Sequence, residues 1–149
     1  MIGRMSDRIL DPEQLLARLP HRPPMRLVER LERVVPGESA VARRLTRADD
    51  WFFDGHFPGE PIVPAVVLIE LIAQTGGLAA ASARPDDRIR MRLAGIHNFK
   101  FPGAAGVGAD LVITAHVRGR MGGLVRIEGE ITAAGQTVAA GSLTLAEVR

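Results

Sequence analysis

Residues 55–74 read G-H-F-P-G-E-P-I-V-P-A-V-V-L-I-E-L-I-A-Q, and the second half of this stretch is almost wholly apolar. The pattern predicts a long helix over residues 64–83, opened by Pro64. Over residues 66–73 this helix is apolar on every side, whereas a surface helix shows a single apolar stripe. We therefore expect a helix that other protein surrounds. One carboxylate, that of Glu70, stands in the middle of it.

The rest of the chain predicts strands on both sides of this helix. Runs rich in β-branched residues are bounded by glycine and proline turns, which is typical of hairpins. A short helix capped by Asp11 precedes them, and a helical turn or a loop is expected at 49–53. We therefore predict an α+β fold in one domain over residues 1–149, an antiparallel sheet of about six strands curled around one long buried helix. The predicted strands span residues 25–35, 39–46, 89–98, 111–118, 124–133 and 137–148, and turns lie at 36–37, 119–123 and 134–135.

The composition excludes several classes of function. The 149 residues include no cysteine, so disulfides, thiol nucleophiles and thiolate metal sites are ruled out, and a cytoplasmic location fits. The net charge is only +2, and the basic residues are spread along the chain with few aromatic residues, which argues against nucleic-acid binding. The N-terminus lacks the apolar stretch of a secretory signal, and the longest apolar run is too short to cross a membrane. We therefore expect a soluble protein with no membrane partner.

Glu70 needs an explanation, because an ionised carboxylate in an apolar interior is costly unless it is paired, hydrogen-bonded or protonated. One interpretation is structural: the carboxylate pairs with an arginine or faces a solvent-filled groove between subunits. The other is catalytic: burial keeps a proton on the carboxyl group near neutral pH, so that it acts as a general acid.

His56 stands in a loop rich in glycine and proline, fourteen residues before Glu70. Such a loop can hold a side chain in a fixed position, and histidine titrates near neutrality. We expect His56 to lie near the N-terminus of the following helix, where the backbone N–H groups of Ala65 and Val66 form a site for a developing negative oxygen. A base, an acid and an oxyanion site together describe removal of a proton next to a carbonyl, with loss of a leaving group from the next carbon.

At these residues the sequence resembles the 3-hydroxyacyl-(acyl carrier protein) dehydratases of type II fatty-acid synthesis, which have the hot-dog fold. The loop at 55–59 reads G-H-F-P-G as in that family, and Glu70 follows the histidine at the family spacing. Residues 19–23, L-P-H-R-P, are similar to the family's N-terminal segment, and L-A-G-I at 93–96 is similar to the strand after its helix. The likeness therefore covers nearly the whole chain.

The resemblance implies a reaction and a role for each residue. His56 would remove the C2 proton of a 3-hydroxyacyl thioester, and Glu70 would protonate the departing C3 hydroxyl, giving a trans-2-enoyl thioester reversibly. No metal or cofactor would be needed. The substrate would arrive on an acyl carrier protein, and the site would be shared by two subunits of a homodimer, which in this family can form a trimer of dimers. The residues expected to bind substrate are Phe57, Gly59, Ala65, Val66 and Gln74.

The chain also departs from the family pattern. Ala65 stands where the family usually has glycine, and the chain has no tyrosine to gate the tunnel. These differences suggest a specialised paralogue of a polyketide or polyene pathway. Two other functions stay open: a hot-dog thioesterase, in which Glu70 activates water against the thioester carbonyl, and a non-catalytic partner subunit of the same fold.

The remaining polar residues of interest have simpler interpretations. His21 and His97 are expected to satisfy local hydrogen bonds, and His116 to lie on an alternating strand. Gln74 lies one helical turn after Glu70, so it either has a structural role or orients the carboxylate, and the sequence favours neither.

Overall fold

The computed structural model describes residues 11–56, 59–84 and 90–148 of the chain. A short helix and two strands precede the long helix, and four strands follow it. In chain order the elements are α1 (Pro12–Leu16), β1 (Arg30–Val35), β2 (Ser39–Leu45), the 3-10 helix η2 (Trp51–Phe53), α2 (Ala65–Ala81), β3 (Met91–Lys100), β4 (Asp110–Met121), β5 (Leu124–Ala133) and β6 (Gln136–Glu147).

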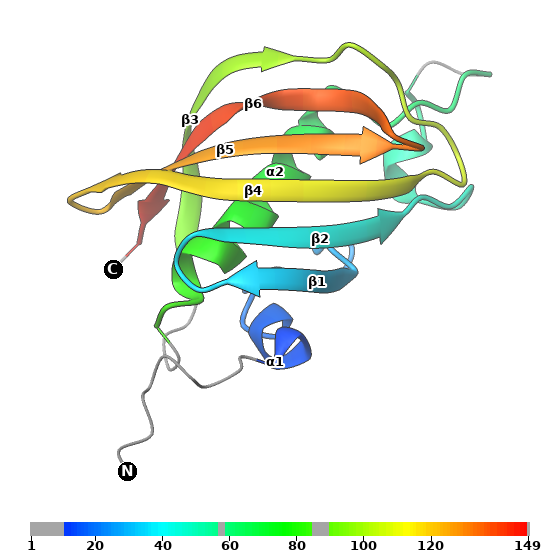
Figure 1. Cartoon of the computed structure of the whole chain (residues 1–149). Coiled ribbons are helices and arrows are strands. Elements are labelled where there is room, and N and C mark those ends of the chain that lie inside the picture. The colour runs from blue at the N-terminus through cyan, green and yellow to red at the C-terminus, as the bar shows by residue number, and fades with distance from the viewer. Residues whose placement is uncertain (1–10, 57–58, 85–89, 149) are drawn as a thin grey trace.

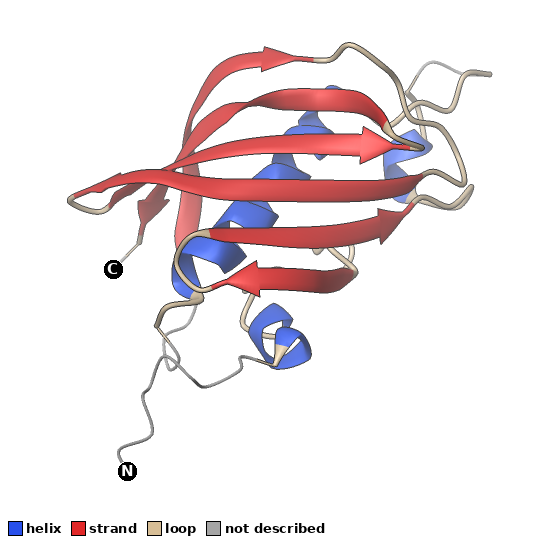
Figure 2. Cartoon of the chain, viewed as in Figure 1, coloured by secondary structure: helices blue, strands red, loops and turns tan. Residues whose placement is uncertain are grey.

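One antiparallel sheet wraps around α2 (Figure 1), with the strand order β1-β2-β4-β5-β6-β3. The helix lies along the concave face of this sheet (Figure 2) and packs on β2, β4, β5 and β6. β3 follows α2 in the chain but pairs with β6, so it forms one edge of the sheet and β1 forms the other. The predicted architecture, an antiparallel sheet curled around one long helix, is confirmed.

Local sequence explains most of these elements. Asp11 caps α1 by accepting a hydrogen bond from the N–H of Glu13 at 3.0 Å. Along β5, buried and exposed residues alternate, because successive side chains of a strand point to opposite faces. The β5–β6 hairpin turns at Ala134 and Gly135, both with positive φ, which suits the right-handed twist of the flanking strands.

Two predicted boundaries differ from the structure by more than two residues. The strand predicted to begin at residue 25 begins at Arg30, because the N–H groups of Leu27 and Val28 donate to the side chain of Gln74 instead of a strand. The turn predicted over residues 119–123 is shorter, since β4 continues to Met121 through a shift in its pairing with β5.

The prediction that protein surrounds α2 on every side is wrong for the first turn of the helix. Every residue over 71–81 is buried, but Ala65 is exposed and Val66 is 72% exposed. The sheet therefore leaves an apolar surface at the end of the helix where the candidate site lies. Neither helix of the described chain is both long and apolar enough to cross a membrane.

Two glycines, one in α2 and one in β5, allow the helix to pack closely against the sheet. A Cβ atom on Gly129 of β5 would lie 2.3 Å from Cγ2 of Ile72, and one on Gly76 of α2 would lie 2.7 Å from Cγ2 of Ile127. Each isoleucine fills the space that the facing glycine leaves open, as close packing requires. This reciprocal contact holds the helix that carries Glu70 in place against the sheet.

One added methyl group at this contact should destabilise the protein. Gly129→Ala is expected to lower the free energy of unfolding by about 1–3 kcal/mol, because Ile72 or the backbone must move to accept the new carbon. Urea denaturation would measure the change. Gly119→Ala on β4 is the matched control, since no neighbour lies within 4 Å of the added atom there. Equal unfolding midpoints for wild type and Gly129→Ala would contradict the contact.

Candidate active site

Glu70 lies on the second turn of α2 and lines a small cavity. Its side chain is 24% exposed, so the carboxyl group is accessible at the wall of the cavity instead of being sealed in the core. No arginine of the described chain forms an ion pair with it, which removes the structural interpretation based on such a pair. The cavity has a volume of about 240 Å³ and is lined by Leu19, His21, Glu70, Ala73, Gln74, Gly77, Met91, Arg92, Leu93 and Leu145.

Gln74 connects Glu70 to the N-terminal part of the chain. Its Nε2 donates to Oε1 of Glu70 at 3.0 Å and to the carbonyl oxygen of Met25 at 2.7 Å. Its Oε1 accepts from the N–H groups of Leu27 at 3.0 Å and Val28 at 3.4 Å. The Gln74 amide thus uses both of its N–H donors and both acceptor sites of its oxygen. The residue itself is only 2% exposed. The sequence left a structural role and an orienting role as alternatives for Gln74. The hydrogen bonds to the backbone fit the first and the hydrogen bond to Glu70 fits the second, so contacts of both kinds are present.

Removing this amide should reduce stability strongly. Gln74→Leu is expected to lower the free energy of unfolding by about 2–4 kcal/mol, because it leaves buried backbone groups without partners. Thermal and urea unfolding would measure the loss. Gln14→Leu, at an exposed position of α1, is the control and should stay near wild type. A Gln74→Leu variant as stable as wild type would show that the four contacts contribute little.

His56 lies in the loop between η2 and α2. Gly55 before it has φ +73°, a backbone conformation that favours glycine. Nδ1 of the His56 ring lies 2.9 Å from the carbonyl oxygen of Ile62. A carbonyl oxygen only accepts hydrogen bonds, so Nδ1 carries a proton, and in the neutral ring the lone pair is then on Nε2. The loop therefore selects the tautomer in which Nε2 can act as a base.

The N-terminus of α2 follows this loop directly. The first N–H groups bonded within the helix are those of Val67 and Leu68, which both donate to the carbonyl oxygen of Pro64. In the part of the chain that the structure describes, no oxygen accepts from the N–H groups of Ala65 and Val66, so both are available to an external oxygen.

Two further residues predicted to bind substrate are Gly59 and Phe57. Gly59 has φ +89°, which again favours glycine. Phe57 lies outside the described residues.

Among the described residues, His56 is not one of those that line the cavity of Glu70. Glu70 is five residues beyond Ala65, which corresponds to about 7.5 Å along the helix axis. Apolar side chains are exposed at this end of the molecule and on the edge strand β3: Val66 is 72% exposed, Ile96 52% and Leu93 38%.

Sequence reasoning missed His21, which it assigned to local hydrogen bonding. Nε2 of His21 lies 3.3 Å from Oε1 of Glu70, although the two residues are far apart in the chain. The only signal that could have found this contact is the place of His21 in the L-P-H-R-P segment, one of the segments that carry the family resemblance.

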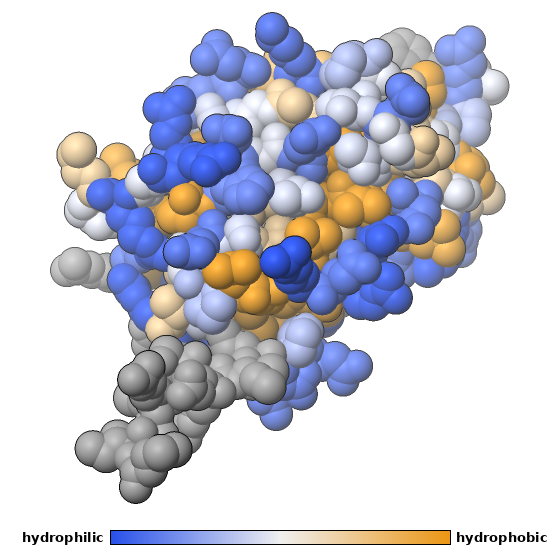
Figure 3. Space-filling model, viewed as in Figure 1, coloured by the Kyte–Doolittle hydropathy of each residue, from blue (hydrophilic) through white to orange (hydrophobic). Residues whose placement is uncertain are grey.

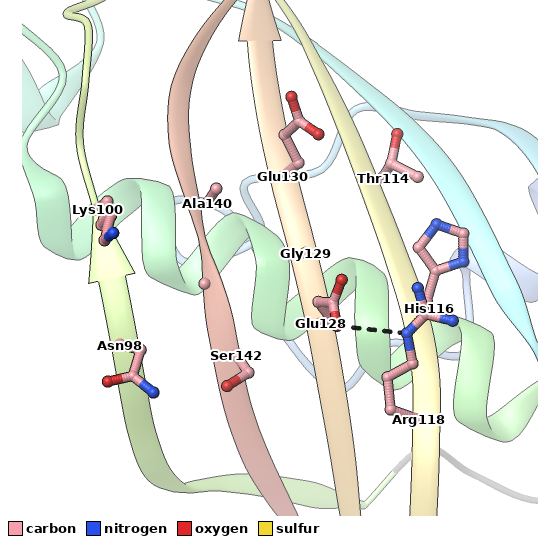
Figure 4. Close-up of a pocket in the computed structure, with 11 residues that line it drawn as sticks. Asn98, Lys100, Thr114, His116, Arg118, Glu128, Gly129, Glu130, Ala140 and Ser142 are labelled. Atoms are coloured by element: carbon pink, nitrogen blue, oxygen red, sulfur yellow. Dashed lines mark ion pairs between the residues drawn. The ribbon is translucent and has the colours of Figure 1, made fainter.

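A second, open hollow of about 490 Å³ lies on the outer face of the sheet (Figure 4). Arg118 and Glu128 form an ion pair there at 3.4 Å, and His116 stands beside them. Hydrophilic and apolar residues are mixed over this face (Figure 3), and the hollow contains none of the predicted site residues. Among the described residues no three Asp, Glu or His side chains are grouped so that they could hold a metal ion.

Comparison with known proteins gives the family. The profile of the FabA-like domain matches residues 19–142. This chain belongs to the FabA-like family. One relative is the 3-hydroxyacyl-(acyl carrier protein) dehydratase FabZ of Roseiflexus castenholzii, 34% identical over 139 residues that cover 93% of this chain and 96% of that protein. FabZ of an Anaeromyxobacter species is 37% identical over 140 residues, which cover 91% of this chain and 89% of that protein.

Solved structures of similar shape confirm the fold. The dehydratase heterocomplex ApeI:P from Xenorhabdus doucetiae matches with a TM-score of 0.79 at 22% identity, covering 94% of this chain and 93% of the other. The PaaI protein of E. coli, from the phenylacetic acid degradation operon, matches with a TM-score of 0.61 at 18% identity, covering 78% and 81%. This member of the FabA-like family therefore has the hot-dog fold that the sequence predicted.

Proposed function

We propose that this chain dehydrates 3-hydroxyacyl thioesters carried on acyl carrier protein to trans-2-enoyl thioesters, with His56 as base and Glu70 as acid. The observation that carries the proposal is a pair of proton carriers in a FabA-like chain. One is a histidine whose Nδ1 is bonded to the backbone, so that Nε2 is the ring atom left to act as a base, and the other is a carboxyl group that is accessible in the wall of a cavity with polar and apolar lining. The FabZ relatives, similar over nearly their whole length, favour this substrate class.

The residues account for each step of the reaction. Nε2 of His56 accepts the proton from C2, and the negative charge that develops on the thioester oxygen is held by the N–H groups of Ala65 and Val66. The C3–O bond breaks as Glu70 gives its proton to the departing hydroxyl, which leaves as water. His56 then returns its proton to solvent and Glu70 regains one, so that the pair is reset.

We also propose that the active site forms between two copies of the chain, with His56 of one subunit opposite Glu70 of the other. Two observations support it: His56 does not line the cavity of Glu70, and apolar side chains are exposed on the first turn of α2 and on β3. β3 is a ten-residue edge strand with exposed Leu93 and Ile96, the kind of edge that pairs with another chain. Pairing β3 with its copy would cover these side chains and place the first turn of α2 within the assembly.

The test is hydration of a trans-2-enoyl thioester, followed as the loss of absorbance of the conjugated double bond. The wild-type chain is expected to hydrate an enoyl group on acyl carrier protein and to reach the same equilibrium from the 3-hydroxyacyl side. A thiol reagent in a parallel reaction measures hydrolysis. Release of thiol without hydration would identify a thioesterase, and the absence of both reactions would leave a non-catalytic subunit.

A further inference from the structure

We propose that His21 is a positioning residue for Glu70: as a neutral Nε2–H donor it holds Oε1 of the carboxyl group and so leaves Oε2 to deliver the proton to the substrate. The inference rests on the proposed function. It adds His21 as a positioning residue and Oε2 of Glu70 as the atom that delivers the proton. It starts from the contact between His21 and Glu70, which joins the N-terminal segment to the helix.

Both contacts of the Glu70 carboxyl group go to the same oxygen. Oε1 lies 3.0 Å from Nε2 of Gln74 and 3.3 Å from Nε2 of His21. Within the described chain, no N–H or O–H group is bonded to Oε2. Oε1 accepts the N–H of Gln74 and has Nε2 of His21 beside it, so it is a poor place for a proton, whereas Oε2 can carry one. These two neighbours therefore distinguish Oε1, which anchors the carboxyl group, from Oε2, which faces the substrate in this proposal.

One side of the His21 ring is buried. Its Nδ1 is shielded from solvent and has no hydrogen-bond partner among the described residues. A second proton on the ring would bury a charged N–H without an acceptor, which is unfavourable. The proton of the neutral ring is then on Nε2, facing Glu70. A neutral donor orients the carboxyl group without holding it as an ionised partner, so that Oε2 can keep a proton to transfer.

Other hydrogen bonds fix the segment that carries His21. Nη1 of Arg22 donates to the carbonyl oxygen of Leu19 at 2.7 Å. Nε1 of Trp51 donates to the carbonyl oxygen of Pro24 at 2.9 Å, and Nη1 of Arg44 donates to that of Leu27 at 2.9 Å. Gln74 binds the same segment from α2. The His21 ring is thus part of a segment held from both sides, which is what a positioning role requires.

Two substitutions separate this role from a structural one. His21→Phe keeps a ring but removes the donor, whereas His21→Gln keeps a neutral N–H at a similar reach. We expect kcat for enoyl-thioester hydration to fall by about 10- to 100-fold in His21→Phe, the range typical when a group that orients a functional side chain is lost, with KM changed by less than about twofold. His21→Gln should recover kcat to within about fivefold of wild type. Both variants should unfold at the wild-type temperature.

A double-variant cycle shows whether His21 acts through Glu70. On a Glu70→Gln background, His21→Phe should cause no further loss, because the group it positions is gone. The nitrogen NMR spectrum of the wild-type imidazoles gives a readout without turnover, in which His21 should show a proton on Nε2 and none on Nδ1 near neutral pH. His116→Phe changes a histidine on the outer face of the sheet, so it is the control and should keep the wild-type kcat.

Each contrary result has a distinct meaning. Wild-type kcat in His21→Phe, or a doubly protonated His21 ring, would overturn this inference alone. A loss that His21→Gln shares, accompanied by a lower unfolding temperature, would replace it with a structural role. A wild-type chain without hydration activity would overturn the proposed function and this inference with it.

Discussion

Replacing His56 with alanine should lower kcat/KM for hydration of a trans-2-enoyl thioester by about 10²- to 10⁴-fold, the contribution typical of a positioned acid or base. The reason is that the C2 proton loses its acceptor, while the hydrogen bond from Nδ1 to Ile62 involves only the loop. Loss of absorbance of the conjugated double bond measures the rate. Glu70→Gln should cause a loss of similar size, since an amide cannot give a proton to the C3 hydroxyl.

The control for His56→Ala is His116→Ala, which removes a histidine from the outer face of the sheet and should leave the rate unchanged. Circular dichroism and the unfolding temperature of each variant show that the fold is kept. A His56→Ala variant with the wild-type rate would mean that another group removes the C2 proton.

Combining the two inactive variants in one dimer should restore activity. If His56 and Glu70 meet across a two-fold interface, a hybrid of His56→Ala and Glu70→Gln subunits holds one site with both groups intact and one site with neither. A hybrid purified through two different tags should then show about half the wild-type rate, although each parent homodimer is nearly inactive. The expected change is therefore a recovery of two or more orders of magnitude.

The reciprocal hybrid is a sharp control for this experiment. Wild type combined with the double variant His56→Ala, Glu70→Gln leaves every shared site with one defective group, so it should be nearly inactive. Were each site built within a single chain, the results would be reversed: the first hybrid would stay inactive and the second would keep half the activity. The two hybrids together therefore decide which chain supplies each group.

Features that depend on neighbouring residues followed from the sequence. Pro64 and the apolar run after it predicted α2, and Ala134-Gly135 predicted the β5–β6 turn, because both depend on local backbone preference and periodicity. The G-H-F-P-G loop and its spacing to Glu70 indicated the family, which the FabA-like match over residues 19–142 confirms.

Features that depend on distant contacts did not follow from it. The strand predicted from residue 25 begins at Arg30 because an amide forty-six residues away at Gln74 takes the N–H of Val28, and no local pattern records that competition. The exposed first turn of α2 was missed for a related reason. An apolar helix face looks the same in a sequence whether its own sheet or a second subunit covers it.

The sequence by itself predicted the order of helices and strands and the curled sheet around α2, and it indicated His56 and Glu70 as candidate proton carriers, since periodicity, turn residues and residue chemistry are local properties. Only the tertiary structure decided the tautomer of His56, the contact of His21 with Glu70 and the four hydrogen bonds of Gln74. Each of these depends on which atoms lie within about 3 Å of one another after the chain has folded. That distance is set by the packing of α2 against the sheet and the N-terminal segment, and by no single stretch of residues.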